Sequence, residues 1–379
     1  MKQPIIIIGS GFAAYQLIKT MRRMGSTDPI QVFSRDSGDE YNKPDLSHVF
    51  SKQQTAASLV KVSGIEFAAQ FNVQLYAYTE VESIDTKAQQ ISANGQCYAY
   101  SKLIFATGAQ PFIPNMSGSG INQVITLNSL AEYQRAQQKL SQAQRVLIIG
   151  GGLIGVEFAM DLATAGRQVT LVEPNRHILA NLLPSQVAVA LEEQLSQDNI
   201  QLALADWVVD IELLPNTCLL VTTQFGRQYT VDSVICAAGL KPNIQLAQAA
   251  NISTNRGIVV DNQLQTSAKN VYALGDCAEI NGQLQAFLQP IILSANTLAK
   301  VLFDQAAELK LAAMMIKIKT PNFPIQLAGN TSKTVARWQL EINHEGILAN
   351  AYNSDNQAIG FIVTHQHTSK AFSLLKSIQ

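Results

Sequence analysis

The chain has 379 residues, of which 47% are hydrophobic and 15% are charged, and its formal net charge is −1. This composition supplies enough apolar material for a folded core and excludes a disordered chain. The small net charge gives no indication of nucleic-acid binding, and no apolar run reaches the ~18 residues of a membrane span. A chain of this length is expected to form two or three domains.

The chain opens with the pattern of a dinucleotide-binding unit. Residues 5–8 are a short β-branched run, typical of a buried parallel strand, and a helix is expected from the following turn to about residue 24. The turn fits G-x-G-x-x-A and consists of Gly9, Ser10, Gly11, Phe12, Ala13 and Ala14. A strand, this turn and a helix in that order predict a site for a dinucleotide.

In dinucleotide-binding units an acid at the end of the second strand binds the ribose, but the first unit of this chain has no acid directly on that strand. The next strand, residues 30–34, ends in Ser34, Arg35 and Asp36 and has no acid directly on the strand. Asp36 is therefore the candidate for the ribose hydroxyls, and Arg35 is available for the adenosine or the pyrophosphate. The sequence leaves the role of this acid open.

Residues 41–114 lead from this unit to a second one. A polar loop at residues 41–47 precedes a helix, residues 73–83 alternate as strands do, and residues 85–96 are expected to form a hairpin. A buried strand at residues 103–105 ends in a turn of small residues, Ala106, Thr107 and Gly108, where the backbone must come close to another group. Residues 110–114 are expected to be a linker.

Residues 146–166 contain the most complete glycine pattern of the chain. A β-branched run at residues 146–149 is followed by Gly150, Gly151, Gly152, Leu153, Ile154 and Gly155, which fit G-x-G-x-x-G. Gly150 allows the tight turn, Gly152 lets a pyrophosphate approach the backbone, and Gly155 lets the helix pack closely on the strand. The helical pattern runs to Gly166, which is a suitable C-terminal stop.

The strand after this helix carries the acid that selects the nucleotide. Residues 169–172 form the expected strand, and Glu173 follows Gly152 by 21 residues. An acid at this place accepts hydrogen bonds from the ribose 2′-OH of NADH and repels the 2′-phosphate of NADPH. Because strand, glycine turn, helix, second strand and terminal acid are all present, the sequence predicts an NADH site.

Two further strand ends complete the predicted fold. Residues 234–236 lead into Ala237, Ala238 and Gly239, a second copy of the turn at residues 106–108, and residues 271–274 lead into Gly275 and Asp276. The first unit is therefore resumed after the second. We expect an α/β fold with two Rossmann-like dinucleotide-binding domains, the first formed by residues 1–109 and 236–309 and the second, for NADH, by the inserted residues 110–235. Residues 310–379 are expected to form a small α+β C-terminal domain.

The cysteines and histidines point to little chemistry. The four cysteines, Cys97, Cys218, Cys236 and Cys277, form neither C-x-x-C nor C-x4-C, so we expect each to be a small buried hydrophobic residue. The five histidines, His48, His177, His344, His365 and His367, are expected on the surface. His365 and His367 have no apparent third ligand, so no metal site is predicted.

Together these motifs resemble those of the flavoprotein reductases with two dinucleotide-binding domains. Within that superfamily the chain resembles the rubredoxin reductases, and most of all the NADH:flavorubredoxin reductases of bacterial nitric oxide detoxification. The two glycine turns carry only the broader resemblance. The narrower one rests on residues 41–48 (YNKPDLSH), 150–159, 273–281 (ALGDCAEIN), 287–290 (FLQP) and 315–321 (MIKIKTP).

The resemblance implies that the first unit binds FAD, with its pyrophosphate over Gly9 to Gly11 at a helix N-terminus. It implies that Asp276 holds the ribityl or pyrophosphate region and that Lys43 lies near flavin N5, paired with Glu157 of the NADH domain. Such a fixed ammonium favours hydride arrival at N5, and the carboxylate keeps the lysine charged and aimed.

The C-terminal third contributes two more contacts by the same resemblance. A helix that starts at Gln289-Pro290, with Pro290 as its first residue, would aim its N-terminus at flavin N1 and O2. Lys319 would reach the flavin from the C-terminal domain. The remaining residues implied to contact FAD are Arg35, Asp36, Pro44, Val81, Ala106, Thr107, Gly108, Gly275 and Leu288. Those implied to contact NADH are Gly150, Gly152, Leu153, Ile154, Gly155, Glu157, Glu173, Ala238 and Gly239.

The function that these residues and the resemblance predict is electron transfer from NADH through FAD to the rubredoxin domain of a flavorubredoxin. A separate rubredoxin or a ferredoxin is the alternative acceptor. A disulfide reductase would need a cysteine pair, and an NADH oxidase or peroxidase a cysteine where the loop has Asp45, Leu46 and Ser47. A nucleotide-dependent binding protein with this fold is the non-enzymatic alternative.

The C-terminal segment differs in charge from the rest of the chain. Residues 310–379 contain seven basic residues, Lys310, Lys317, Lys319, Lys333, Arg337, Lys370 and Lys376, and three acidic ones, for a net charge of +4. Such a segment would steer an acidic protein carrier. We expect a cytoplasmic monomer or weak dimer that binds neither nucleic acid nor membrane.

Overall fold

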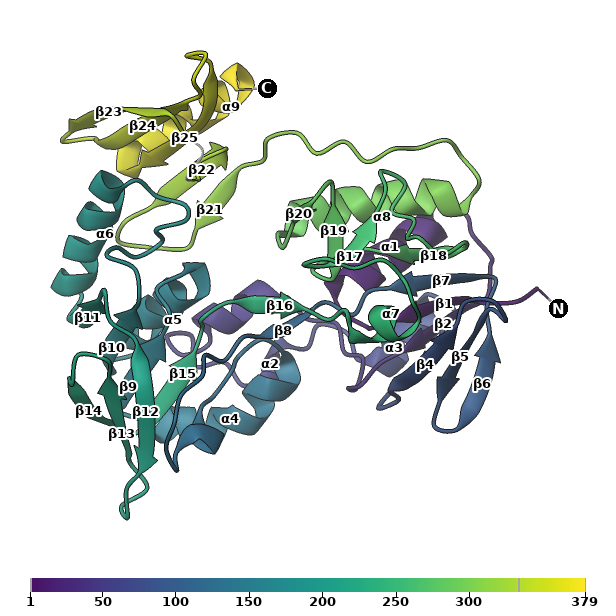
Figure 1. The fold of residues 1–379 in the computed structure, drawn as a ribbon, viewed down its shortest axis with the longest axis horizontal. Coiled ribbons are helices and arrows are strands. Elements are labelled where there is room, and N and C mark those ends of the chain that lie inside the picture. Colours follow the sequence, from purple (N-terminus) through teal and green to yellow (C-terminus); the bar gives the residue numbers. More distant parts are fainter. Residues whose placement is uncertain (1, 333–334, 379) are drawn as a thin grey trace. The chain divides into compact units, whose positions relative to one another are not determined.

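The computed structural model describes residues 2–332 and 335–378, so Lys333 of the basic C-terminal segment lies outside the described residues. The chain forms two compact units. The first unit contains Met1–Lys43, Ala56–Gln110 and Leu240–Leu311, and the second contains Pro44–Thr55, Pro111–Gly239 and Ala312–Gln379. Figure 1 shows the elements of both. The three-domain boundaries expected from the sequence stay a prediction.

A parallel sheet forms the centre of the first unit. Its strand order is β18 (Val271–Ala273), β7 (Lys102–Phe105), β1 (Ile5–Ile8), β2 (Ile30–Phe33) and β3 (Gln74–Tyr76). All four isoleucines of β1 are buried, as expected for a central parallel strand covered on both faces. Helices α1 (Phe12–Arg23) and α8 (Leu288–Leu302) pack against each other and lie on one side of this sheet (Figure 1).

Smaller elements surround this sheet. Helix α3 (Gly64–Gln70) begins with a capping box between Ser63 and Glu66. The other elements are α2 (Ala56–Leu59), the antiparallel sheet β4 (Val81–Asp85), β5 (Gln90–Ala93) and β6 (Gln96–Ala99), helix α7 (Gln245–Ala249), the sheet β17 (Ile258–Val260), β19 (Ala278–Ile280) and β20 (Gln283–Leu284), and the pair β8 (Ala109–Pro111) and β16 (Leu240–Pro242).

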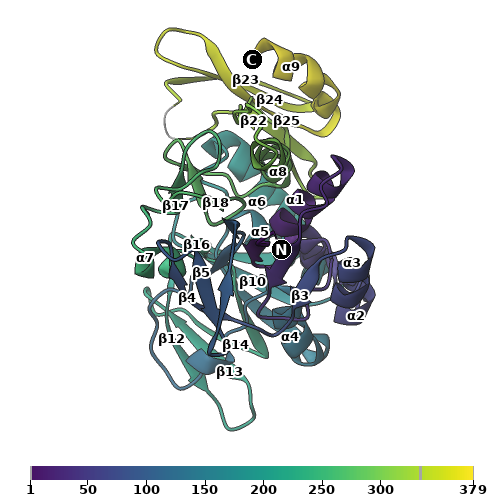
Figure 2. The same ribbon diagram turned by 90° about the vertical axis from the view of Figure 1, so that its right-hand side faces the viewer.

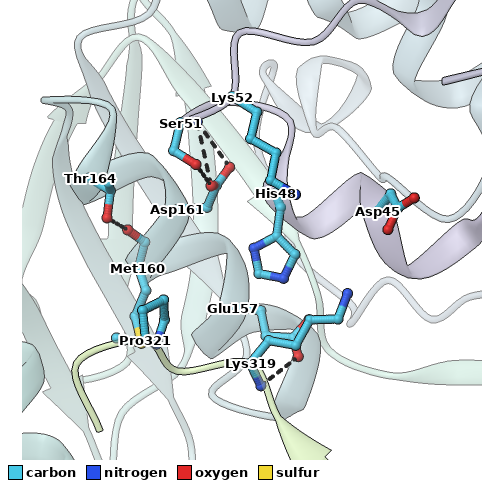
Figure 3. Close-up of a pocket in the computed structure, with 10 residues that line it drawn as sticks. All are labelled: Asp45, His48, Ser51, Lys52, Glu157, Met160, Asp161, Thr164, Lys319 and Pro321. Atoms are coloured by element: carbon cyan, nitrogen blue, oxygen red, sulfur yellow. Dashed lines mark hydrogen bonds between the residues drawn. The ribbon is translucent and has the colours of Figure 1, made fainter. Parts of the chain in front are cut away.

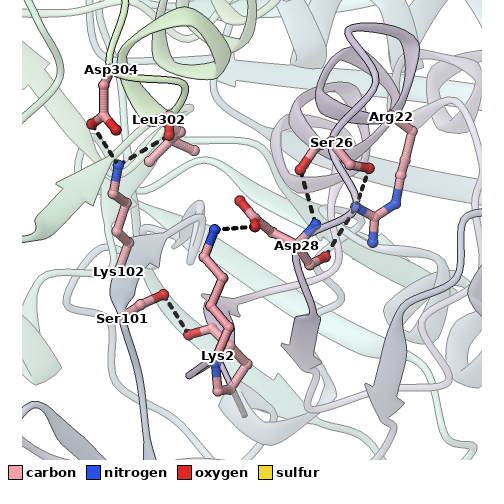
Figure 4. A network of polar contacts seen from close by, with 9 residues as sticks. Lys2, Arg22, Ser26, Asp28, Ser101, Lys102, Leu302 and Asp304 are labelled. Carbon is pink, nitrogen blue, oxygen red and sulfur yellow. Dashed lines mark hydrogen bonds and ion pairs between the residues drawn. The ribbon is translucent and has the colours of Figure 1, made fainter.

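Polar contacts tie the amino-terminal edge of the first sheet to its helices (Figure 4). The ammonium of Lys102, the first residue of β7, donates to the carbonyl of Leu302 at the end of α8, at 3.0 Å. Arg22, near the end of α1, donates to the carbonyls of Ser26 and Asp28 at 3.0 and 3.1 Å. The opposite, carboxyl edge of the sheet is where ligands bind in folds of this kind.

The second unit has its own parallel sheet, ordered β11 (Ile200–Leu204), β10 (Gln168–Glu173), β9 (Arg145–Ile149) and β15 (Ser233–Cys236). Helices α4 (Leu130–Gln142), α5 (Leu153–Thr164) and α6 (Ser185–Gln197) accompany it. An antiparallel sheet of β12 (Val208–Leu213), β13 (Leu219–Thr223) and β14 (Gln228–Val231) and two 3-10 helices, η1 (Lys43–His48) and η2 (Ile121–Gln123), complete this region. Gly166 has a φ of +79° just after α5, which confirms it as the helix stop.

The C-terminal segment folds into an antiparallel sheet of the second unit. Its order is β21 (Ile316–Ile318), β22 (Ile325–Gly329), β25 (Ala358–Thr364), β24 (Gly346–Tyr352) and β23 (Arg337–Asn343). A 3-10 helix, η3 (His365–Lys370), leads into α9 (Ala371–Ser377), which packs on β22 and β25 (Figures 1 and 2).

The α/β fold with two Rossmann-like sheets is confirmed, and a few local expectations are wrong. Residues 110–114 were expected to be a linker, but β8 includes the first two of them because the backbone pairs there with β16. Pro290 is the third residue of α8, whose N-cap is Phe287. Because the first four N–H groups of a helix have no intrahelical partner, proline is tolerated at the third position as well as at the first.

Across residues 2–332 and 335–378, every helix is too short or too polar to cross a membrane.

Candidate active site

The two glycine turns are built in the same way. Gly9 and Gly150, the first glycines of the two patterns, both have a φ of +108°. A Cβ atom at Gly9 would lie 2.2 Å from the carbonyl oxygen of Ala106, and one at Gly150 would lie 2.6 Å from that of Ala237. Each turn therefore touches the end of a neighbouring strand so closely that only glycine fits, which explains the small residues predicted at those strand ends.

The next glycine of each turn has open space beside it. Gly11 and Gly152 are the N-cap residues of α1 and α5, with the same φ of −76° and ψ of −176° and no side-chain cap. A Cβ at either position would meet nothing within 4 Å. In contrast, the N-caps Ser63 and Ser129 accept hydrogen bonds from the first turns of α3 and α4.

These open helix N-termini fit the pyrophosphate of a dinucleotide. No packing requirement explains the glycine at positions 11 and 152, and the first N–H groups of α1 and α5 receive no side-chain cap. Uncapped N–H groups with the positive end of the helix dipole bind phosphate oxygens, and a missing Cβ lets those oxygens approach. The residues present at both turns are therefore suited to a dinucleotide.

Glu173 lies beside the glycine turn of the second unit. Its carboxylate is buried and accepts hydrogen bonds from the backbone N–H of Gly151 at 2.6 Å and of Asn175 at 2.9 Å. The acid at the end of β10 is thus held against the turn, at the place expected of a ribose acceptor. Its contact with the ribose 2′-OH stays a prediction.

The corresponding acid of the first unit is Asp36. Its carboxylate accepts hydrogen bonds from the hydroxyl of Ser34 at 2.7 Å, from that of Ser10 at 3.2 Å and from the N–H of Gly38 at 3.0 Å. Ser10 belongs to the glycine turn, so this carboxylate also lies beside its turn although it follows the strand by three residues. Arg35 forms an exposed ion pair with Glu80 at 2.7 Å.

Lys43 and Asp276 come together within the first unit. The Lys43 ammonium lies 3.6 Å from the Asp276 carboxylate. Asp276 follows β18 directly after Gly275, which has a φ of +81°. The predicted pairing of Lys43 with Glu157 joins residues of different units and stays a prediction.

The other residues expected around FAD also lie in the first unit, except for Pro44 and Lys319. Thr107, in the turn after β7, donates its hydroxyl to the carbonyl of Asn243 at 3.0 Å. Val81 is buried at the start of β4. Helix α8 has no side-chain cap at its N-terminus, and its first residue, Leu288, is exposed. An uncapped helix start with an exposed apolar side chain suits a flat aromatic ring with polar edge atoms.

Within the second unit, Glu157 joins three segments of the chain. Its carboxylate, on α5, accepts hydrogen bonds from the hydroxyl of Ser47 at 2.6 Å and from the backbone N–H of Lys319 at 3.3 Å. The Lys319 ammonium donates in turn to the carbonyl of Pro44 at 2.7 Å. We call Glu157, Ser47, Lys319 and Pro44 the Glu157 junction; Figure 3 shows Glu157 and Lys319 side by side.

A second carboxylate, one turn further along α5, holds the same loop. Asp161 is buried and accepts hydrogen bonds from the backbone N–H of Phe50 at 2.8 Å and from the hydroxyl of Ser51 (Figure 3). Tyr133 donates to the carbonyl of Gln54 at 2.6 Å. Residues 44–55 are therefore attached to the second unit, although the chain on both sides of them belongs to the first. This role of Asp161 is absent from the residues predicted above, although the spacing of two acids on one helix face was an available signal for it.

A cavity of about 410 Å³ lies next to the Glu157 junction (Figure 3). His48, Lys52, Asp161 and Lys319 are among the residues that line it. Partial burial lowers the pKa of His48, and the positive charge of Lys319 lowers it further, against the opposite effect of Glu157 and Asp161. These surroundings favour the neutral form of the His48 imidazole.

Two expectations about cysteine and histidine are wrong. Cys97 is exposed, because β6 is an outer strand of a small hairpin sheet, and Cys218 is only partly buried. Cys236 and Cys277 are buried as expected, and burial raises the pKa of both thiols, so neither is a ready nucleophile. His367 is 1% exposed, since it lies in η3, which packs on β24 and β25 of the C-terminal sheet.

The described part of the chain contains no cluster of three or more His, Cys, Asp or Glu side chains that could hold a metal ion.

Two parallel sheets, each entered by a glycine turn with an open helix N-terminus, define a protein with two dinucleotide sites. Residues 3–297 match the family model described as pyridine nucleotide-disulphide oxidoreductase, and residues 308–378 match the one described as rubredoxin binding C-terminal domain. The chain therefore belongs to the pyridine nucleotide-disulphide oxidoreductase family. The resemblance noted from the sequence motifs is confirmed.

Curated relatives match the chain from end to end. A protein of Vibrio vulnificus (strain YJ016) named nitric oxide reductase FlRd-NAD(+) reductase is 57% identical, over 100% of this chain and 98% of its own. A protein of the same name from Escherichia coli O127:H6 is 44% identical over 100% of both chains. Among solved structures, the covalent putidaredoxin reductase–putidaredoxin complex has a TM-score of 0.89 at 23% identity and covers 99% of this chain and 93% of its own, which shows the shared fold.

The open space at Gly152 is tested by the substitution Gly152→Ala. The added Cβ meets no atom of the protein, so the variant should fold and keep its FAD, while NADH binds at least about tenfold more weakly because the methyl group occupies the place of the pyrophosphate. Fluorescence titration with NADH and thermal unfolding measure the two effects.

The matched control is Gly155→Ala, whose Cβ would lie 1.9 Å from the carbonyl oxygen of Gly150. This variant should lose thermal stability. Wild-type NADH affinity in Gly152→Ala would show that the open space is not a nucleotide site.

The buried carboxylate of Glu173 predicts a preference for NADH. The 2′-phosphate of NADPH would be placed against this charge, so kcat/KM should be at least about tenfold higher for NADH, and Glu173→Gln should narrow the ratio. Steady-state kinetics with NADH and with NADPH measure the ratio of the two kcat/KM values. Equal values in the wild-type protein would remove Glu173 from nucleotide selection.

Proposed function

We propose that this protein is an FAD-dependent reductase that oxidises NADH and delivers the electrons to the rubredoxin domain of a flavorubredoxin. One observation carries the proposal: the 57% identity to a nitric oxide reductase FlRd-NAD(+) reductase extends over the whole chain, including the segment that matches the rubredoxin-binding model. The two open helix N-termini supply the sites for the two nucleotides that such a reaction requires.

When bound, FAD supplies the chemistry that joins a two-electron donor to a one-electron acceptor. The residues of the chain bind the two nucleotides and orient them. The N-terminus of α1 would receive the FAD pyrophosphate, with Asp36 held beside the glycine turn by Ser10 and Asp276 paired with Lys43. The N-terminus of α5 and Glu173 would hold the NADH pyrophosphate and ribose.

Lys43 is the candidate for direct assistance to hydride transfer. Its ammonium is positioned by Asp276 at 3.6 Å, and a fixed positive charge beside the accepting ring favours arrival of a hydride. We therefore assign Lys43 to hydride transfer from NADH to the flavin. The C-terminal segment is assigned to binding of the protein that accepts the electrons.

The surface of α9 supports an acidic protein as acceptor. Phe372 is 74% exposed, and Lys376 follows it by one helical turn on the same face. Lys370, just before the helix, is also exposed, and the sequence from residue 356 to 379 contains no acidic residue. An exposed aromatic ring flanked by lysines suits an acidic carrier with an apolar centre. We call Lys370, Phe372 and Lys376 the α9 patch.

A stand-alone rubredoxin and a ferredoxin remain the alternative carriers, since charge alone does not distinguish acidic proteins. The cytoplasmic location and the monomeric or weakly dimeric state expected from the sequence are parts of the same proposal.

The direct test is anaerobic stopped-flow. NADH should bleach the flavin absorbance of the purified protein rapidly, and an isolated flavorubredoxin rubredoxin domain should restore it much faster than a ferredoxin does. Restoration only by oxygen or peroxide would contradict the proposed function and favour an oxidase.

Neutralising Lys43 tests its part in the reaction. Lys43→Met should slow flavin bleaching by NADH about tenfold or more, because the fixed charge is lost where negative charge arrives. Lys87→Met, in an exposed turn of the β4–β5 hairpin, is the matched control and should behave as wild type. An unchanged bleaching rate in Lys43→Met would exclude a role in hydride transfer.

Removing the charges of the α9 patch tests the acceptor side. The double variant Lys370→Gln/Lys376→Gln should lower kcat/KM for the carrier about tenfold at low salt, and the difference should shrink as salt screens the charges. Flavin bleaching by NADH should not change. If the double variant reduces the carrier as fast as wild type at low salt, the docking surface lies elsewhere.

A further inference from the structure

Lys319 lies in the segment that matches the rubredoxin-binding model, yet its contacts are with the loop that follows Lys43. Its ammonium donates to the carbonyl of Pro44 at 2.7 Å, and Pro44 is the next residue after Lys43. Its backbone N–H donates to Glu157 at 3.3 Å, the carboxylate that also receives the hydroxyl of Ser47 at 2.6 Å. Lys319 therefore binds this loop directly through Pro44, and both Lys319 and the loop donate hydrogen bonds to the Glu157 carboxylate.

The turn that follows Lys319 is held in place as well. Thr320, the next residue, donates its hydroxyl to the carbonyl of Phe323 at 2.5 Å and closes a tight turn after β21. Asn322 in that turn donates to the carboxylate of Asp198, the C-cap of α6, at 3.1 Å. Through Asn322 the turn is attached to the end of α6, so the backbone on the far side of Lys319 from β21 is also held within the second unit.

A comparison with Lys317, which lies in β21 two residues before Lys319, separates this role from that of a general positive charge. Lys317 is exposed, Ile318 is buried, and Lys319 is partly buried with its ammonium on a backbone carbonyl. An ammonium engaged in this way is less available to a carrier than that of Lys317.

We propose that Lys319 is a positioning residue through which the C-terminal segment holds the backbone that carries Lys43. The side chain of Lys43 is placed by Asp276, and the peptide that follows it is placed by Lys319 together with Ser47 and Glu157. This role rests on the proposed function in that Lys43 assists the NADH half of the reaction. A segment matched to acceptor binding thus contributes to flavin reduction.

His48 offers a readout that does not depend on turnover. It lines the same cavity as Lys319, and the charges around it there are Lys52, Asp45, Glu157 and Asp161. Burial and the positive charge of Lys319 both lower the pKa of His48. Removing that charge should therefore raise the pKa of His48, so that its NMR titration midpoint moves to higher pH.

The experiment compares Lys319→Met, Lys319→Arg and Lys317→Met in the FAD-loaded protein without any carrier. Lys319→Met should slow flavin bleaching by NADH about tenfold, because a loosened loop misplaces Lys43. It should also speed hydrogen exchange of the amides at residues 45–51 and raise the His48 midpoint. Lys319→Arg, which keeps a donor and the charge, should recover much of the rate, and Lys317→Met should match wild type.

Three outcomes would overturn the proposal. The first is a Lys319→Met protein with normal bleaching and exchange but a raised KM for the carrier, which would place Lys319 in docking. The second is an unchanged His48 midpoint, which would place the Lys319 charge away from the cavity that His48 lines and from Pro44 beside it. The third is Lys319→Arg as slow as Lys319→Met. Failure of the proposed function would appear separately, as wild-type protein that is bleached by NADH but not reoxidised by the rubredoxin domain.

Discussion

The structure depends on two helix N-termini that the protein leaves without a cap. Helices α1 and α5 begin at glycines with the same backbone conformation, where a side chain would have room and a serine could serve as a cap. The N–H groups left without side-chain partners there are suited to an anionic ligand. The close turns at the first glycines, Asp36 three residues beyond β2 and Glu173 at the end of β10 all lie beside these two helix starts.

Residues 44–55 form the second constraint. Their sequence neighbours belong to the first unit, but Glu157 and Asp161 on α5 hold them on the second. Lys43 stands at the point where the chain passes from one unit to the other, with its side chain on Asp276. The position of Lys43 therefore depends on contacts in both units. For this reason we propose that Lys319, which lies in the segment matched to rubredoxin binding, helps to position Lys43.

Local patterns in the sequence predicted the features that depend on neighbouring residues alone. The glycine turns, the buried strands and the helix stop at Gly166 follow from backbone conformation and hydrophobic periodicity, and they are present as expected. The attachment of residues 44–55 could not be predicted, because it rests on hydrogen bonds between residues about a hundred positions apart. The burial of His367 depends on the packing of η3 against the C-terminal sheet, and the exposure of Cys97 depends on the outer position of β6; residue type alone indicates neither.

The central claim is that the two similar turns hold different nucleotides. A crystal structure of the protein with FAD and NAD+ tests it most directly. We expect the FAD pyrophosphate at the N-terminus of α1, over Gly9 to Gly11, and the NAD+ pyrophosphate at the N-terminus of α5 with its ribose on Glu173. A structure with the two nucleotides exchanged, or with either pyrophosphate away from these helix starts, would contradict it.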